Sequence, residues 1–321
     1  MSGGSVPLEE LSFREASAAD LHEAFRLTRR AMHSAARRLG ITDGPEPGDG
    51  EIEELWTRRR ASLEFLAAQP DGTSWVCEGP RGMLGFARVL RFDGMEQLTH
   101  VVVDPTDQER GIGRELLERC WPYSPTPELG RIVVAPGSAQ DLTLYTEFGV
   151  MPITGHWRMV IGAAEYAERR SQETADVAEP GVHVLKEERA AEEWTRLEAR
   201  AIGHGRPALH EFFARERTCL ACLDDDGHAR SLCWVSPEGE IGPGVGAAAE
   251  DVVPVVLTAL DRVAKMHEPE ELEVTCTTDS WWLLRRLRTL GFRVRWPSWV
   301  LCSEPLPGLD RYVPTRPGFV L

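Results

Sequence analysis

Apolar residues along the first half of the chain recur at two spacings, one typical of helices and one typical of strands. Helical spacing predicts helices over about 21–39, 51–68, 115–121 and 138–148. Short apolar runs predict strands at 12–16, 74–78, 83–90, 96–103, 131–135 and 154–161. The order strand, two helices, three strands, helix, strand, helix, strand predicts an α/β domain built on a mixed sheet.

The same pattern starts again in the second half. Strands are expected at 182–186, 218–223, 229–236, 271–277 and 298–303, and helices at 191–201, 210–217, 252–264 and 280–290. This parallel spacing predicts a second, degenerate copy of the same fold. We therefore expect a disordered tail over 1–10, a first domain over 11–162 and a second domain over 182–321 that ends in a proline-rich extended tail. The charged stretch 163–181 is expected to be an interdomain linker or a surface helix.

Composition narrows the classes of partner. The 321 residues suffice for two domains. A net charge of −15 argues against nucleic acid or an anionic membrane as the main partner. There is no run of 18 apolar residues, and the N-terminus lacks the basic and apolar segments of a secretory signal. We expect a cytoplasmic protein.

The seven cysteines do not suggest a disulfide framework, because their number is odd and the chain is large. Cys219 and Cys222 have the spacing of some metal and redox sites. They fall in a predicted strand, however, where positions three apart point to opposite faces. We interpret them as ordinary buried thiols and expect no metal site.

The most informative stretch is 103–114, which reads Val-Asp-Pro-Thr-Asp-Gln-Glu-Arg-Gly-Ile-Gly-Arg. It joins a buried strand to the start of a helix, whose first N–H groups have no internal partners and carry partial positive charge. Gly111 and Gly113 allow a ligand to approach the backbone closely, and Arg110 and Arg114 add cationic donors. This pattern predicts a pyrophosphate-binding turn.

Two motifs give the first half a family resemblance. Val-x-Pro followed by Gln-x-x-Gly-x-Gly and a helix, over 103–114, resembles motif A of the Gcn5-related N-acetyltransferases (GNATs). The stretch 144–150, Leu-Tyr-Thr-Glu-Phe-Gly-Val, resembles their motif B. The resemblance implies two tandem GNAT-fold domains with acetyl-CoA as the cosubstrate. It also implies that the pantetheine arm pairs with the backbone of Val101 and Val103. The pyrophosphate would then be bound by the backbone around Gln108, Arg110, Gly111, Ile112, Gly113 and Arg114.

The resemblance also supplies candidate catalytic residues. GNATs transfer the acetyl group by direct attack, so no nucleophilic cysteine is assigned. Tyr145 occupies the position of the general acid that protonates the leaving thiolate; the alternative is a core tyrosine. Glu96 and His100, on the strand that leads into motif A, are both candidates for the general base. Glu96 could instead be merely exposed, and His100 could be a core histidine.

The second copy lacks this chemistry. Where its phosphate loop is expected, at 241–247, the sequence is Ile-Gly-Pro-Gly-Val-Gly-Ala, with no Gln or Arg, and Pro243 removes an N–H donor. We expect this half to be structural or to shape the substrate groove; the alternative is residual acyl-CoA binding.

Together these features predict an acetyl-CoA-dependent N-acetyltransferase that acts on a primary amine of a small molecule, with its active site in the first half. A monomer or homodimer is expected. Two alternatives stay open, namely a non-catalytic acyl-CoA sensor or scaffold, and an acyltransferase that uses a hydroxyl acceptor or a longer acyl chain.

Overall fold

The structure is a computed structural model that describes residues 7–124, 129–173 and 181–315. It divides into two compact units. Unit 1 comprises Met1–Val133 and Ser138–Met151, and unit 2 comprises Val134–Gly137 and Pro152–Leu321. The helices and strands confirm the predicted mixed α/β fold class, because parallel and antiparallel strand pairs occur in the same sheet.

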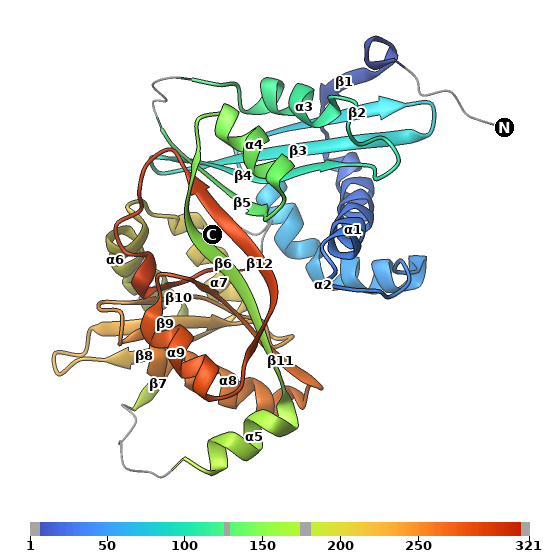
Figure 1. The fold of residues 1–321 in the computed structure, drawn as a ribbon. Helices are drawn as coiled ribbons and strands as arrows, with labels where there is room; N and C mark the ends of the chain where they lie inside the picture. Colours follow the sequence, from blue (N-terminus) through green and yellow to red (C-terminus); the bar gives the residue numbers. More distant parts are fainter. Residues whose placement is uncertain (1–6, 125–128, 174–180, 316–321) are drawn as a thin grey trace. The chain divides into compact units, whose positions relative to one another are not determined.

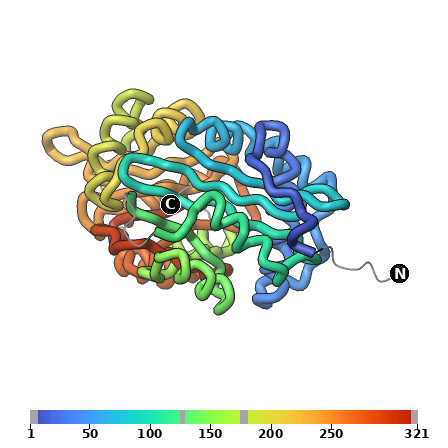
Figure 2. The backbone as a smooth tube through the Cα atoms, turned by 90° about the horizontal axis from the view of Figure 1, so that it is seen from above, coloured from blue at the N-terminus to red at the C-terminus, as the bar shows by residue number. Residues whose placement is uncertain are grey.

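The strands of unit 1 follow the order β1-β2-β3-β4-β5. Neighbours pair antiparallel, except that β4 and β5 are parallel. In Figures 1 and 2 the strands β2, β3 and β4 form the cyan-to-green meander of this unit. The strands are β1 (Ser12–Glu15), β2 (Thr73–Gly79), β3 (Gly82–Phe92), β4 (Met95–Val103) and the first part of β5 (Gly130–Pro136). The helices are α1 (Leu21–Arg38), α2 (Asp49–Ala67), α3 (Ile112–Cys120) and α4 (Ala139–Glu147).

Helices α1 and α3 cover opposite faces of this sheet. Phe86 on β3 packs with Ala24 and Leu27 of α1. The preceding residue, Gly85, faces the other way, and a Cβ there would lie 2.9 Å from both Ile112 and Leu116 of α3. Successive residues of a strand point to opposite faces, so β3 separates an α1 face from an α3 face.

Unit 2 contains two groups of strands. One is a five-stranded sheet of order β13-β10-β9-β8-β7, and the other has the order β12-β6-β11. The strands are β6 (Met151–Gly162), β7 (Val182–Leu185), β8 (Thr218–Leu223), β9 (Ala229–Val235), β10 (Ile241–Gly246), β11 (Glu271–Thr277), β12 (Arg293–Cys302) and β13 (Tyr312–Val313). The helices are α5 (Ala163–Ser171), α6 (Glu187–Ile202), α7 (Pro207–Glu216), α8 (Val252–His267) and α9 (Trp281–Thr289).

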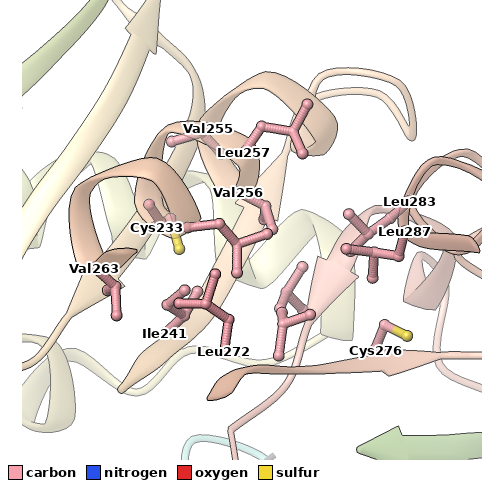
Figure 3. Close-up of a cluster of buried hydrophobic side chains, with 14 of the residues drawn as sticks. Cys233, Ile241, Val255, Val256, Leu257, Val263, Leu272, Cys276, Leu283 and Leu287 are labelled. Atoms are coloured by element: carbon pink, nitrogen blue, oxygen red, sulfur yellow. The ribbon is translucent and has the colours of Figure 1, made fainter. Parts of the chain in front are cut away.

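Unit 2 contains a large cluster of buried apolar side chains. Val255, Val256 and Val263 from α8 belong to it, together with Ile241 on β10 and Leu287 on α9 (Figure 3). Removal of this much apolar surface from water is the main stabilising contribution to such a unit.

The predicted domain boundary at residue 162 does not coincide with the compact units. Strand β6 pairs with β11 from Gly162↔Glu271 to His156↔Thr277. Residues 152–162 therefore group with the second half, although the sequence pattern assigns them to the first. Of the predicted linker, residues 163–171 form the helix α5, whose Tyr166 is buried in the core of unit 2 and donates a hydrogen bond to Asp261 Oδ1 (2.6 Å).

The two predicted tails contain ordered segments. Residues 1–6 of the predicted disordered tail lie outside the described residues, whereas Leu8–Glu10 form a short 3-10 helix. In the C-terminal tail, Leu309–Arg311 form another such turn (η3), and β13 pairs with β10. Tyr312 of β13 is buried, and its hydroxyl donates to Glu198 Oε1 (3.3 Å). The segment up to residue 315 is therefore part of unit 2 and not an appendage.

Candidate active site

Strand β4 leaves its neighbour β5 part of the way along. The parallel pairing runs from Met95↔Gly130 to Leu98↔Val133. At the next residue the pairing of β4 with β3 shifts register, because Leu98 lies opposite Val89 and His100 lies opposite Arg88. Thr99 is thus the extra residue of a β-bulge. Beyond it Val101 and Val103 remain partly exposed, where an extended ligand could pair as an added strand.

The loop after β4 is fixed by its own polar side chains. Asp104 Oδ1 accepts hydrogen bonds from the Thr106 N–H (3.0 Å) and hydroxyl (2.7 Å). The Gln108 amide donates to the carbonyl oxygen of Val103 (3.2 Å) and accepts from Arg38 (2.7 Å). Gly111 then has φ +83°, a conformation that glycine adopts without strain. The loop is therefore held in a defined shape at the start of α3.

The start of α3 offers unused N–H groups. Its first backbone hydrogen bond runs from the Glu115 N–H to the Gly111 oxygen (3.0 Å), and no side chain caps the helix. Among the described residues, the amides of Ile112, Gly113 and Arg114 have no acceptor. These are the groups that bind phosphates at helix N-termini.

Gly113 is not required by the packing of the protein. A Cβ there would lie 3.7 Å from Val103 Cγ2 and 3.9 Å from Val101 Cγ1, which are ordinary contact distances. A side chain could therefore begin at this position without a clash against β4. A glycine in that place leaves the backbone accessible to a ligand.

The two arginines of the loop bind carboxylates of the protein itself. Arg110 pairs with the buried Asp107, and Asp107 also pairs with Arg81. Arg114 pairs with Glu147 at the end of α4, and both side chains are about half exposed. Their direct role in phosphate binding stays a prediction. In this structure Arg110 stabilises the loop, whereas exposed pairs such as Arg114–Glu147 are weak and easily exchanged.

Tyr145 lies on α4, which begins where the Asp141 N–H donates to Ser138 Oγ (3.0 Å). The Tyr145 side chain is 7% exposed. Its hydroxyl has no hydrogen-bond partner among the described residues and is not sealed from solvent. Burial raises the pKa of the phenol, and Asp141 and Cys120 add to this shift. A protonated donor that reaches solvent is what a general acid requires.

The two candidates for the general base have different surroundings. Glu96 is buried and forms ion pairs with Arg91 Nε (2.9 Å) and Arg131 Nε (3.2 Å). A carboxylate bound by two guanidiniums favours a structural role. His100 makes a contact with Thr99 Oγ1 (3.1 Å), and burial together with nearby Arg88 lowers its pKa to about 3. It is therefore neutral at physiological pH and can accept a hydrogen bond.

Sequence reasoning missed Arg88, which lies opposite His100 on β3. It is 3% exposed. Its Nε donates to Ser74 Oγ on β2 (3.3 Å), and its guanidinium lies 5.1 Å from the centre of the Phe86 ring. The signal in the sequence is a single arginine in the apolar run 83–90.

The stretch 241–247, where the sequence places the second half's counterpart of the phosphate loop, is not a loop for most of its length. Residues 241–246 form the buried strand β10. Its glycines allow the C-terminal segment to approach, because a Cβ at Gly242 would lie 3.0 Å from the Pro314 oxygen. The cysteines of the second half's Cys-x-x-Cys, Cys219 and Cys222, are buried in β8.

Comparisons with known proteins support the same fold. No protein-family model and no curated protein matches the sequence. Among solved structures, a putative acetyltransferase from Pyrococcus horikoshii is 16% identical, with 99% of this chain and 98% of that chain covered and a TM-score of 0.69. A tandem GNAT protein from the clavulanic acid biosynthesis pathway is 19% identical (92% and 99% covered, TM-score 0.58). A GCN5-related N-acetyltransferase from Sphaerobacter thermophilus is 18% identical (95% and 99% covered, TM-score 0.57). The similarity extends over nearly the whole chain in each case, so the chain has the fold of the tandem GNAT proteins.

Proposed function

We propose that this chain is an acetyl-CoA-dependent N-acetyltransferase whose active site lies in the first half and whose acceptor is the primary amine of a small molecule. The observation that carries the proposal is the helix start at α3. Three amides without acceptors, at Ile112, Gly113 and Arg114, follow the loop 104–111, which leads out of a strand whose outer part is partly exposed. Backbone amides at a helix start suit a pyrophosphate, and the strand suits a pantetheine arm.

The acetyl thioester would supply the acyl group. Residues of this chain would orient the reactants and protonate the leaving thiolate. Tyr145 would donate its phenolic proton to the sulfur as the carbon–sulfur bond breaks. His100, which is neutral, would accept a hydrogen bond from the incoming amine. The amine nitrogen would bond to the acetyl carbon and lose one proton to water, and water would return a proton to Tyr145. Glu96 would have a structural role and not a catalytic one, since Arg91 and Arg131 already bind its carboxylate.

The second half would not bind the cosubstrate. Strand β10 is buried along its length and pairs with β13 of the same chain. The proposal therefore includes a single acetyl-CoA site.

A cytoplasmic location and the absence of a metal requirement belong to the same proposal. Within the described part of the chain, no helix is long and apolar enough to span a membrane.

The test is a thiol-release assay with acetyl-CoA and a library of primary amines, carried out on wild type and Tyr145→Phe. Amine-dependent release that falls in the variant supports an N-acetyltransferase. Binding of CoA without release for any amine favours the non-catalytic sensor. Release with alcohols, or with longer acyl-CoA thioesters in preference to acetyl-CoA, favours the other alternative.

A further inference from the structure

Arg88 is a buried cation, and the described part of the chain supplies no counter-ion for it. Arginine is rarely buried to 3% exposure unless a carboxylate pairs with it. Within residues 7–124, 129–173 and 181–315, no ion pair of Arg88 with a carboxylate is found. The contacts it does make are a neutral hydroxyl, Ser74 Oγ at 3.3 Å, and the face of Phe86. Neither neutralises its charge.

The guanidinium stays charged under physiological conditions. Burial lowers the pKa of Arg88 to about 10, which still leaves it protonated at neutral pH. Its Nη atoms are not sealed from solvent. The side chain is thus buried along its length while its donors can still be reached. Removing a cation from water is costly unless an anion compensates for it.

The position of Arg88 links it to the proposed active site. Ser74, Arg88 and His100 lie opposite one another on β2, β3 and β4 and so share the α1 face of the sheet. The Thr99 hydroxyl of the β-bulge donates to the backbone oxygen of Arg88 (3.2 Å). The cation therefore lies beside His100, next to the place where β4 leaves β5.

We propose that Arg88 binds a carboxylate of the acceptor substrate, so that the acceptor is an amino acid or another small amine that also carries a carboxylate. This inference rests on the proposed transferase function. Nε is engaged by Ser74, which leaves the Nη donors for a carboxylate. Guanidinium donors match the two oxygens of a carboxylate in a geometry that an amine cannot use. The acceptor would thus be oriented by its anionic group, with its amine toward His100.

The experiment compares amino acids with the amines that result from removal of their carboxylates, such as lysine with 1,5-diaminopentane and phenylalanine with phenethylamine. Binding of all twenty amino acids and their amine counterparts is measured calorimetrically in the presence of CoA, and turnover is measured as thiol release from acetyl-CoA. The proteins are wild type, Arg88→Met, Arg88→Lys and the control Arg60→Met. Arg60 is an exposed arginine of α2 that forms an ion pair only with Glu64 among the described residues, so this control also removes one positive charge.

For at least one pair, wild type should bind and acetylate the amino acid about 10- to 100-fold better than its counterpart. Arg88→Met should lose this preference, while the affinity and turnover of the counterpart amine change less than about threefold. Arg88→Lys should keep part of the preference for the amino acid, and Arg60→Met should keep all of that preference. Melting curves of each variant confirm that it is folded. If Arg88 had a purely structural role, Arg88→Met would lower binding and turnover equally for both members of a pair.

The two proposals can fail separately. Acetylation of amines without any preference for a carboxylate, or a preference that survives in Arg88→Met, overturns the inference and leaves the transferase function standing. Carboxylate binding that depends on Arg88 without thiol release supports the inference and contradicts the transferase function. If no amino acid binds wild type more tightly than Arg88→Met, the inference is overturned.

Discussion

Val313 lies directly opposite Gly244 in the antiparallel pair of β13 and β10, and a Cβ on Gly244 would lie 3.2 Å from the Cβ of Val313. The C-terminal segment thus pairs with the strand that precedes helix α8, in the second half. In the first half, the strand that precedes helix α3 ends in partly exposed residues. In the second half the chain's own C-terminal segment thus takes the place that we propose for an extended ligand in the first half.

Gly244→Val should destabilise unit 2, because the added side chain forces β13 away from β10. We expect a loss of about 1–3 kcal/mol in the free energy of unfolding, measured by urea denaturation. Gly162→Ala is the control in the same unit, since nothing lies within 4 Å of a Cβ at that position. Equal stability of the two variants would show that β13 does not pack closely against residue 244 of β10.

Tyr145→Phe should lower kcat by about 10- to 100-fold and leave the KM for acetyl-CoA nearly unchanged. The free energy of unfolding should change little, because the hydroxyl forms no hydrogen bond with the part of the chain that the structure describes. Steady-state kinetics and urea denaturation measure the two quantities. A large loss of stability with unchanged kcat would instead indicate that Tyr145 is a core residue.

Glu96→Gln should reduce stability more than activity. Loss of the carboxylate leaves Arg91 and the buried Arg131 without their common counter-ion, at a cost of about 2 kcal/mol. Activity per folded molecule should stay within about twofold. The control is Glu64→Gln, which removes an exposed pair with Arg60 and should cost no more than about 0.5 kcal/mol. Loss of activity at full stability would identify Glu96 as the general base.

His156 predicts a pH dependence of stability. Burial lowers its pKa from 6.5 to about 4, although a hydrogen bond with the Thr315 oxygen (3.0 Å) opposes the shift. Because the unfolded chain binds the proton more readily, the neutral imidazole contributes its full stability above pH 6.5 and loses it as the pH falls toward 4.

His156→Gln keeps a side-chain N–H donor and removes the titration. The stability of wild type relative to this variant should fall by about 2–3 kcal/mol between pH 7 and pH 4.5, as measured by urea denaturation at each pH. A difference between the two proteins that does not change with pH would contradict the buried, neutral state of His156.

The local features of the site were predictable, whereas its long-range partners were not. The turn around Gly111 follows from adjacent residues, and the structure has it at the start of α3 as predicted. The partner of Arg114 is Glu147, on a different helix, and no local pattern indicates that pair. Arg88 was missed for the same reason, since its significance depends on β2 and β4 as well as on β3.

The glycines of 241–246 illustrate a different limit. Glycine marks a turn in some sequences and a close approach of another strand in others. Only the position of β13, far along the chain, distinguishes the two cases. The grouping of β6 with β11 likewise depends on strand pairing between distant segments, which the order of the predicted elements does not reveal.

The most direct test of the account is a calorimetric titration of CoA into wild type, Gly113→Glu and Gly50→Glu. Gly113 and Gly50 are each the second residue of a helix, α3 and α2, where an acidic side chain suits the helix dipole and should leave the fold intact. The account predicts one site in wild type and in Gly50→Glu, and no binding to Gly113→Glu at an unchanged melting temperature. Unchanged binding to Gly113→Glu, or two sites in wild type, would contradict it.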